Sequence, residues 1–373
     1  MKVKHRLPWL ALVLATLALA VVAAGCGGGN EAATTTEPAA TGATGAAGGG
    51  TTTEGGGGTA IKVGLVTDTG GVDDRGFNQF SIAGLKDAEE QLGVTSRIFV
   101  SNSADDYLPN LNAAAQDGND LVIAVGFLLA PATIQTATAF PDIKFAGVDH
   151  FYGGDGCEDS GTCEQPNAVG MQYPSEESGY LAGVVAAMMT KSKVVSTVGG
   201  IKIPPVDNWI AGFQQAVYDT DPSIKVLNQY SQDFDDQAKC KEIALDQISQ
   251  GSDVLFQVAG KCGLGALDAA CQKGINAIGV DADQSFAGPC VITSALKPLQ
   301  SSVFAMIKSV VDGTYKGGEN QFFGVQDLPD AQLLAPFTDA VPQEVQDAAE
   351  AAKQKIVSGE IDPPSTIEAV KKP

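Results

Sequence analysis

Residues 61–92 read IKVGLVTDTGGVDDRGFNQFSIAGLKDAEEQL. The first seven, 61–67, are mostly aliphatic and β-branched, which favours a buried strand. From Phe77 to Leu92 apolar residues recur at near-helical spacing and Gly93 follows, so this part predicts a helix that ends at the glycine. A polar loop joins the two. A strand, a loop and a helix in this order form the unit from which helix-covered parallel sheets are built.

The same alternation continues along the chain. Predicted strands cover 61–67, 97–101, 121–126, 144–148, 193–198, 225–228, 253–258, 277–280 and 291–294. Predicted helices cover 77–92, 175–191, 235–250 and 342–359, with others in the remaining gaps, and the proline-containing segment 203–209 is predicted to be a turn. The fold class is therefore α/β, with mainly parallel sheets flanked by helices.

The sixty residues before this pattern differ in composition from the rest of the 373-residue chain. Residues 1–25 combine basic residues, an apolar run and small residues, which is typical of an export signal. Residues 27–60 include 12 Gly, 9 Thr and 8 Ala, so they are expected to form a disordered tether with a reach on the order of 30 Å. The 313 residues of 61–373 are enough for two domains of roughly 150 residues.

Charge and histidine content exclude several functions. Without the signal, 20 basic residues face 44 acidic ones, a net charge of −24, which disfavours binding to nucleic acid or to anionic lipid. His150 is then the single histidine, so a hydrolase triad or a multi-histidine metal site is a poor expectation. We expect no enzymatic activity, cofactor or metal. Gly263 and Gly265 follow a strand, but Asp268 stands where a dinucleotide-binding motif needs a further glycine.

Six cysteines remain in the exported part, and an even number there indicates disulfides. Their spacing and the lack of nearby histidines argue against metal binding. Cys157 and Cys163 are expected to close a short loop. Of the possible pairings, we predict Cys240–Cys271, because both lie on consecutive predicted helices, and Cys262–Cys290, because both lie beside strands.

Candidate ligand contacts follow the predicted strands, at the edge where parallel sheets usually bind ligands. Asp68 follows the first strand, Asp149 and His150 follow the fourth, and Asp281 and Asp283 follow the strand at 277–280. Asp74 and Asp73 are interpreted as helix-start residues, Asp283 as a possible turn residue, and His150 as more typical of a structural than a sugar-binding histidine.

Five segments occur in order that resemble the basic membrane protein family of bacterial lipoproteins, a branch of the type I periplasmic solute-binding proteins that includes purine nucleoside receptors of ABC transporters. They are TDTGGVDDRGFNQ (67–79), ESGYLAGVVAA (177–187), GGIKIPPV (199–206) with Gly212 and Phe213, GVDADQ (279–284) and TSALK (293–297). Cys26, after Ala23, Ala24 and Gly25, resembles a lipobox cysteine, although an ordinary signal peptide is the alternative.

The resemblance implies a two-lobed, hinged fold of the type I periplasmic binding proteins. Lobe 1 would comprise 61–170 and about 296–330, and lobe 2 would comprise 171–295 and about 331–373. By correspondence with the family, Phe77 and Trp209 would be stacking rings, Asn78 a base-edge partner, and Gly212 a point of close backbone approach. Asp68, Asp149 and Asp281 would be acidic contacts, and Lys297 a cation near the hinge.

The function implied by the resemblance is capture of a nucleoside, purine rather than pyrimidine, for import by an ABC permease. Two rings and several carboxylates suit a base and a ribose, and the carboxylates would repel nucleotides. The expected protein is a monomer, lipid-anchored through Cys26 on the outer side of the bacterial cell membrane. Alternatives are a receptor of this family for another small polar solute, or a surface adhesin that reuses the fold.

Overall fold

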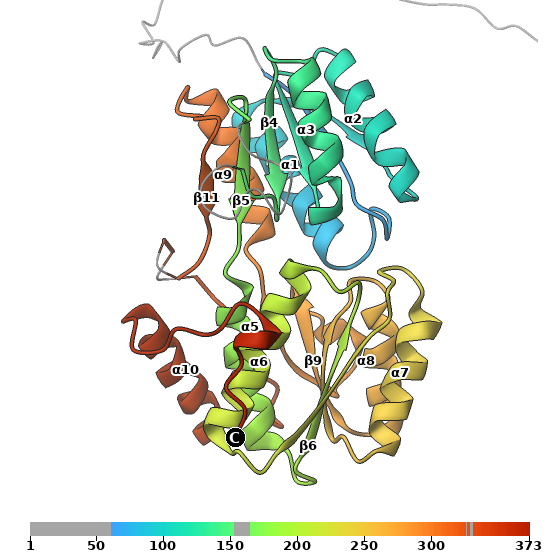
Figure 1. Cartoon of the computed structure of the whole chain (residues 1–373), viewed down its shortest axis with the longest axis vertical. Coiled ribbons are helices and arrows are strands. Elements are labelled where there is room, and N and C mark those ends of the chain that lie inside the picture. The colour runs from blue at the N-terminus through green and yellow to red at the C-terminus, as the bar shows by residue number, and fades with distance from the viewer. Residues whose placement is uncertain (1–60, 153–164, 326, 329–330) are drawn as a thin grey trace, which may run out of the picture. The chain divides into compact units, whose positions relative to one another are not determined.

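Two parallel sheets organise the chain, one in the upper and one in the lower half of Figure 1. The computed structural model describes residues 61–152, 165–325, 327–328 and 331–373. The first sheet has six strands in the order β11-β5-β4-β3-β1-β2, and the second has five in the order β10-β9-β8-β6-β7. The expected α/β class, with parallel sheets flanked by helices, is confirmed.

Both faces of the first sheet are buried, because successive residues along each strand point to opposite faces and pack under different helices. Its strands are β1 (Lys62–Val66), β2 (Thr95–Phe99), β3 (Leu121–Val125), β4 (Lys144–Val148), β5 (Ala168–Gln172) and β11 (Asn320–Phe322). Its helices are α1 (Phe77–Leu92), α2 (Tyr107–Gln116), α3 (Ala130–Ala139) and α9 (Leu299–Val311). Leu65 and Ile123 pack with α1 and α9, whereas Val66 and Val122 pack with α2 on the opposite face.

The second sheet is built in the same way. Its strands are β6 (Val194–Gly199), β7 (Lys225–Tyr230), β8 (Val254–Val258), β9 (Asn276–Asp281) and β10 (Val291–Leu296). Its helices are α5 (Ser175–Met189), α6 (Pro204–Thr220), α7 (Gln237–Ser249), α8 (Gly263–Lys273) and α10 (Gln343–Val357). The core shared with α5 and α6 includes Phe256 and Ile278, whereas Leu255 packs with α7 and α8 on the other face.

The chain passes between the two sheets more than once. The connection from β5 to α5 leads from the first sheet to the second, and the connection from β10 to α9 leads back. Helix α9 packs against α1, and β11 then pairs with β5 at the edge of the first sheet. Helix α10 packs against α5 beside the second sheet.

The nine predicted strands are all present, with ends displaced by at most two residues. Strands β5 and β11 were not predicted, because neither has a continuous β-branched run and β11 has only three residues. The predicted turn at 203–209 is wrong. Pro204 and Pro205 occupy the first positions of α6. In the first turn of a helix the backbone N–H has no partner within the helix, so proline loses nothing by lacking it, and its fixed φ suits a helix.

The disulfide pairing predicted for the second half is also wrong, because the bonds are Cys240–Cys262 and Cys271–Cys290. Their Cα atoms lie 5.5 and 5.1 Å apart. Cys240 in the first turn of α7 and Cys262 just before α8 share the carboxyl edge of the sheet, whereas Cys271 near the end of α8 and Cys290 just before β10 share the opposite edge. A bond between the edges would have to span most of a helix, roughly 13 Å, beyond the reach of a disulfide. Cys157 and Cys163 lie outside the described residues, as does Cys26.

Candidate functional site

A cavity lies where the carboxyl ends of strands from both sheets meet. It contains about 620 Å³ of atom-free space, including open solvent at its mouth. Seven of the eight predicted ligand-binding residues line it: Asp68, Phe77, Asn78, Asp149, Trp209, Asp281 and Lys297. Because these residues come from segments far apart in the sequence, only the fold brings them together.

Four aromatic side chains among the described residues line the cavity. Phe77 opens α1, and Trp209 on α6 is buried with its ring edge against Phe256, the centroids 6.2 Å apart. The other two were not predicted: Phe127 follows β3, and Phe234 precedes α7. The signal for Phe234 was available, because it lies in the loop after a predicted strand, at the same edge of the sheet as the other candidates.

Asp68 is held at the end of β1 by several donors. Its Oδ1 accepts hydrogen bonds from the Tyr107 hydroxyl and from the backbone N–H of Thr69, the latter at 2.7 Å. Burial raises the pKa of Asp68 to about 6, although both hydrogen bonds act in the opposite direction. Gly126 is required beside it, since a Cβ there would lie 2.3 Å from Asp68 Oδ2.

Asn78 holds the loop that precedes α1. Its Nδ2 lies 3.0 Å from the carbonyl oxygens of Thr69 and Gly71 and 3.3 Å from that of Asp68, while its Oδ1 accepts from Asp68 N–H at 3.1 Å. These bonds occupy both donors of the amide, so Asn78 positions the loop, and the expected base-edge contact stays a prediction. Asp74 accepts from the backbone N–H groups of Asn78 and Gln79, which confirms it as a helix-start residue.

Asp149 and Lys297 form an ion pair inside the cavity wall. The Lys297 Nζ lies 2.9 and 2.8 Å from the two carboxylate oxygens of Asp149. The same ammonium group lies 5.2 Å from the centroid of Phe77 and 6.0 Å from that of Trp209. Asp149 adopts φ 63°, a left-handed conformation that is costly for a non-glycine residue and is often found at functional sites.

Asp281, at the end of β9, is another carboxylate of the cavity lining. Its backbone is also left-handed, with φ 66°, and the residue is only 8% exposed. No hydrogen bond to its carboxylate is found among the described residues. Burial raises the pKa of Asp281 to about 7, and the nearby carboxylates of Asp149 and Asp74 add to this effect while Lys297 opposes it. A buried acceptor of this kind needs donors from a ligand or from water.

Gly212 does not line the cavity. A Cβ at this position would lie 2.1 Å from the backbone oxygen of Glu176, so the glycine permits close packing of α6 on α5. Gly179 on α5 has the reciprocal arrangement, with the Trp209 backbone oxygen 2.2 Å from where a Cβ would lie. The close backbone approach implied for Gly212 exists, but it is made to a helix.

His150 also lies outside the cavity lining. It is fully buried, with Nδ1 2.6 Å from the Tyr152 hydroxyl and Nε2 2.8 Å from the Gly126 carbonyl oxygen. Burial lowers the pKa of His150 to about 4, so the ring is neutral at physiological pH. This geometry supports the structural interpretation. Asp283 accepts from Ser285 N–H at 2.9 Å, as a turn residue does.

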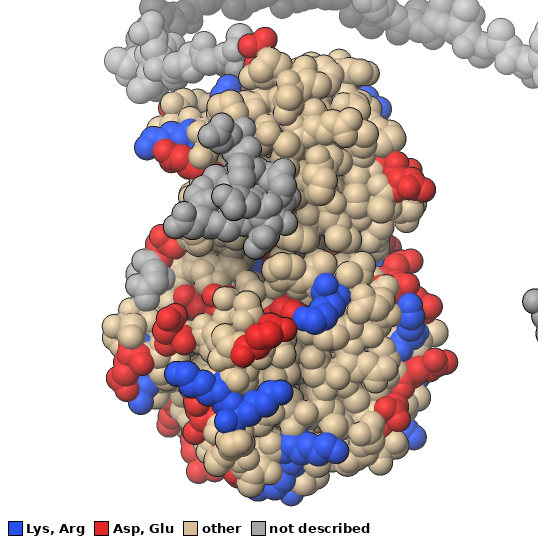
Figure 2. Space-filling model, in the orientation of Figure 1, with Lys and Arg blue, Asp and Glu red and all other residues tan. Residues whose placement is uncertain are grey.

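Neither the surface charge nor the metal-ligating residue types indicate a second kind of site in the described residues. In Figure 2 basic side chains are interspersed with acidic ones, mainly over the lower half of the molecule. Within the described residues, no group of His, Cys, Asp and Glu is arranged to hold a metal ion. The same residues contain no helix with the length and apolar character needed to cross a membrane.

Comparison with known proteins identifies the family. A family model described as "ABC transporter substrate-binding protein PnrA-like", the Bmp family, matches residues 61–366. The chain belongs to this family. The chain is therefore an ABC transporter substrate-binding protein, and the resemblance seen in the sequence is confirmed.

Relatives of this Bmp protein agree with the assignment. The "ABC transporter nucleoside-binding protein BmpA" of Lactococcus lactis is 32% identical over 331 residues, which cover 82% of this chain and 90% of the relative. An "uncharacterized lipoprotein" of Pyrococcus horikoshii is 30% identical, over 80% of this chain and 78% of the relative. A solved solute-binding protein of an ABC transporter system from Aeropyrum pernix K1 superposes with a TM-score of 0.72 at 25% identity, covering 81% of this chain and 92% of that one.

Proposed function

We propose that this Bmp protein is an extracytoplasmic receptor that captures a nucleoside, preferentially a purine nucleoside, and delivers it to an ABC permease. The observation that carries the proposal is the carboxylate of Asp281, to which no described residue donates a hydrogen bond, in a cavity lined by aromatic rings. A ribose supplies vicinal hydroxyl donors for such a carboxylate, and a base supplies a flat surface for the rings. The Lactococcus lactis relative, which is named as nucleoside-binding, supports the same ligand class.

Stacking favours a purine because a purine offers the larger flat surface. Phe77 and Phe127 approach from the first sheet, and Trp209 and Phe234 approach from the second. Stacking on one ring contributes about 1–3 kcal/mol per base, so contacts from both sides supply much of a micromolar affinity. Since the rings belong to different lobes, a bound base favours the closed arrangement of the lobes.

Phosphorylated forms should bind weakly. Both lysines of the cavity lining already pair with aspartates, Lys297 with Asp149 and Lys261 with Asp235. Asp68 and Asp281 are further carboxylates in the lining. In a poorly solvated cleft, repulsion between carboxylates and a phosphate is only partly screened. The receptor therefore takes the uncharged nucleoside.

The binding test uses Trp209. Once residues 1–25 are removed it is the only tryptophan in the chain, and it lines the cavity. The purified protein is titrated with adenosine, guanosine, inosine, cytidine, uridine, ribose and adenosine monophosphate, while fluorescence and thermal stability are followed. Saturable binding of purine nucleosides at lower concentrations than the rest supports the proposal. Binding only of a different solute, for example one identified by mass spectrometry of the purified protein, would overturn the nucleoside assignment.

Membrane attachment is the second part of the proposal. Cys26, after removal of residues 1–25, would carry the lipid, and 27–60 would link it to the folded part. The test compares the wild-type protein with Cys26→Ser in a bacterial host. We expect the wild type in the membrane fraction with a lipid-modified N-terminal peptide, and the variant without that modification. An unmodified wild-type protein in the soluble fraction would support the ordinary signal peptide instead.

A further inference from the structure

Two loops form part of the second-sheet wall of the cavity, beside α6 and the ends of β8 and β9. The 231–236 loop between β7 and α7 contributes Phe234, and the 259–262 loop between β8 and α8 contributes Gly260 and Lys261. Neither loop belongs to a strand or helix, so the sheet alone does not fix the position of the Phe234 ring. The Phe234 ring packs against the second-sheet core beside Gly200, and contacts between the two loops help to position the backbone that carries it.

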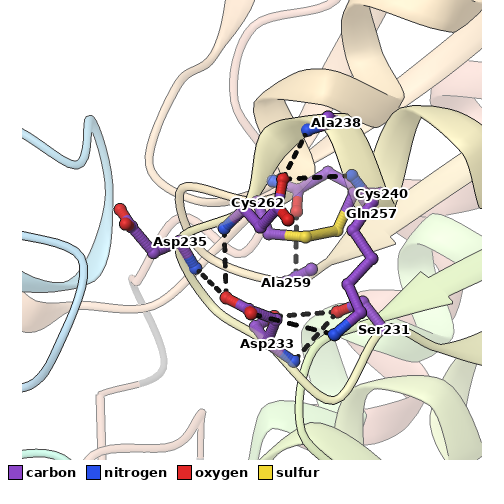
Figure 3. Close-up of a disulfide and its surroundings, with 10 residues drawn as sticks. Ser231, Asp233, Asp235, Ala238, Cys240, Gln257, Ala259 and Cys262 are labelled. Carbon is purple, nitrogen blue, oxygen red and sulfur yellow. Dashed lines mark hydrogen bonds and ion pairs between the residues drawn. A yellow bond between two sulfur atoms is a disulfide. The ribbon is translucent and has the colours of Figure 1, made fainter. Parts of the chain in front are cut away.

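Three contacts connect the two loops or their immediate neighbours. The Cys262 N–H donates to the Phe234 carbonyl oxygen at 2.9 Å, and Lys261 Nζ lies 2.7 Å from Asp235 Oδ1. The disulfide joins Cys262 to Cys240 in the first turn of α7. Figure 3 shows the disulfide at the base of the loops, beside Asp233 and Asp235.

These contacts differ in strength. The Lys261–Asp235 pair is substantially exposed, so solvent and salt weaken it. The Cys262–Phe234 hydrogen bond is a single backbone contact. The disulfide is covalent, and both of its cysteines are fully buried. It is therefore the strongest of the three connections.

Other hydrogen bonds of the 231–236 loop stay within it or reach the end of β6, where the Gly199 and Gly200 carbonyl oxygens accept from Ser231 and Gln232 N–H at 2.8 and 3.0 Å. Asp233 Oδ1 accepts from the N–H groups of Asp235 and Asp236, and Asp236 caps α7 by accepting from Ala238 N–H at 3.0 Å. These bonds shape the 231–236 loop and the start of α7. They do not attach that loop to the 259–262 loop.

We propose that the Cys240–Cys262 disulfide is a positioning element of the binding site, which holds Phe234 and Lys261 at the cavity wall. The proposal rests on the proposed nucleoside function for its ligand. Without the bond the loops separate more easily and the Phe234 ring is no longer held for stacking. Loss of one stacking ring corresponds to a decrease in affinity of about tenfold or more.

The chain offers a matched control in its second disulfide. Cys271–Cys290 lies in the same half of the molecule and closes a loop of similar length, with a sequence separation of 19 against 22 for Cys240–Cys262. Neither Cys271 nor Cys290 lines the cavity. Removing either bond should lower stability to a similar extent through the unfolded chain, but only the first should alter binding.

The experiment measures nucleoside affinity for the wild type, C240S/C262S and C271S/C290S, each with and without Phe234→Ala. We expect C240S/C262S to bind about tenfold more weakly and C271S/C290S to bind as the wild type does. Phe234→Ala should weaken binding strongly in the wild type and much less in C240S/C262S, because there the ring is already displaced. Equal affinities for the two double variants, or an undiminished effect of Phe234→Ala, would overturn the proposal.

Two further measurements separate this proposal from its assumptions. Hydrogen exchange at the Cys262 amide needs no ligand, and it should be faster in C240S/C262S than in C271S/C290S. If no nucleoside binds the wild type, the proposed function fails while this exchange difference still tests the positioning.

Should C240S/C262S not fold, the C271S/C290S protein is titrated before and after reduction, with thiol labelling to show that Cys240 and Cys262 have opened. Unchanged affinity after opening would then refute the positioning role.

Discussion

Lys297 and Asp149 join the two sheets through a buried ion pair. Asp149 follows β4 of the first sheet, and Lys297 follows β10 of the second. The side chain of Lys297 is 3% exposed and that of Asp149 is 7% exposed, and the lysine Nζ lies within 2.9 Å of both carboxylate oxygens. The pair therefore fixes one wall of the cavity at the point where the chain returns to the first sheet.

Lys297→Met should strongly destabilise the protein. It leaves the buried Asp149 carboxylate without its cation, and breaking a buried pair in this way typically costs about 3–5 kcal/mol. The measurement is the free energy of unfolding in urea. Lys308→Met is the control, since Lys308 pairs with Asp312 on the exposed surface of α9 and such pairs contribute at most about 1 kcal/mol. Similar small losses for both variants would show that the buried pair is not needed for stability.

The buried Asp281 should make stability depend on pH. Its pKa is raised from an ordinary value of 3.8 to about 7 by burial, so the folded protein binds the proton more tightly than the unfolded chain. The resulting stabilisation is fully present below about pH 4 and is lost as the pH rises through about 7. Asp281→Asn removes this dependence. Unfolding free energies of both proteins from pH 4 to 8 should show the wild type losing stability relative to the variant, and parallel curves would contradict the expectation.

Asp281 should also distinguish ribose from deoxyribose. If its carboxylate accepts the ribose hydroxyls, a 2′-deoxynucleoside should bind the wild type more weakly by about 10- to 100-fold, the value of a hydrogen bond to a charged group. Asp281→Asn should weaken ribonucleoside binding and reduce the ratio between the two ligands. Isothermal titration gives all four affinities. A ratio unchanged in Asp281→Asn would place the ribose elsewhere in the cavity.

Gly212→Val tests close packing of α5 on α6. The added Cβ would meet the Glu176 backbone oxygen, which cannot move without the helix, so we expect a loss of roughly 3 kcal/mol in unfolding free energy. Ala351→Val on the exposed side of α10 provides the control and should cost about 0.5 kcal/mol through helix propensity. A Gly212 variant as stable as this control would mean that the two helices can separate freely.

Most of the fold could be predicted because its signals are local. Buried parallel strands are continuous apolar runs, and the helices between them carry periodic apolar faces, so nine strands were found to within two residues. Strand β11 was not predicted, because three residues at a sheet edge are too few to show a strand pattern. The start of α6 was not predicted, because its two prolines are also typical of a turn.

The candidate site was predictable in part, for a related reason. Asp68, Asp149 and Asp281 follow strands in the sequence, and the ends of parallel strands meet at one edge, so position along the chain indicated position in space. The sequence does not indicate how a side chain is used. Asn78 holds a loop, Gly212 packs two helices, and Phe234 lines the cavity from a loop without a recognisable motif.

The sequence by itself determined the α/β class, nine of the eleven strands in the described residues, and the acidic and aromatic residues available at their ends, since these depend on composition and on periodicity within short segments. Tertiary structure decided the contacts between segments. Only in the folded chain do Cys240 and Cys262 share an edge of the second sheet, and only there does Lys297 reach Asp149 while no described residue donates a hydrogen bond to the Asp281 carboxylate. The physical reason is that a disulfide, an ion pair and an unsatisfied carboxylate each depend on distances of a few ångströms between residues far apart in the chain.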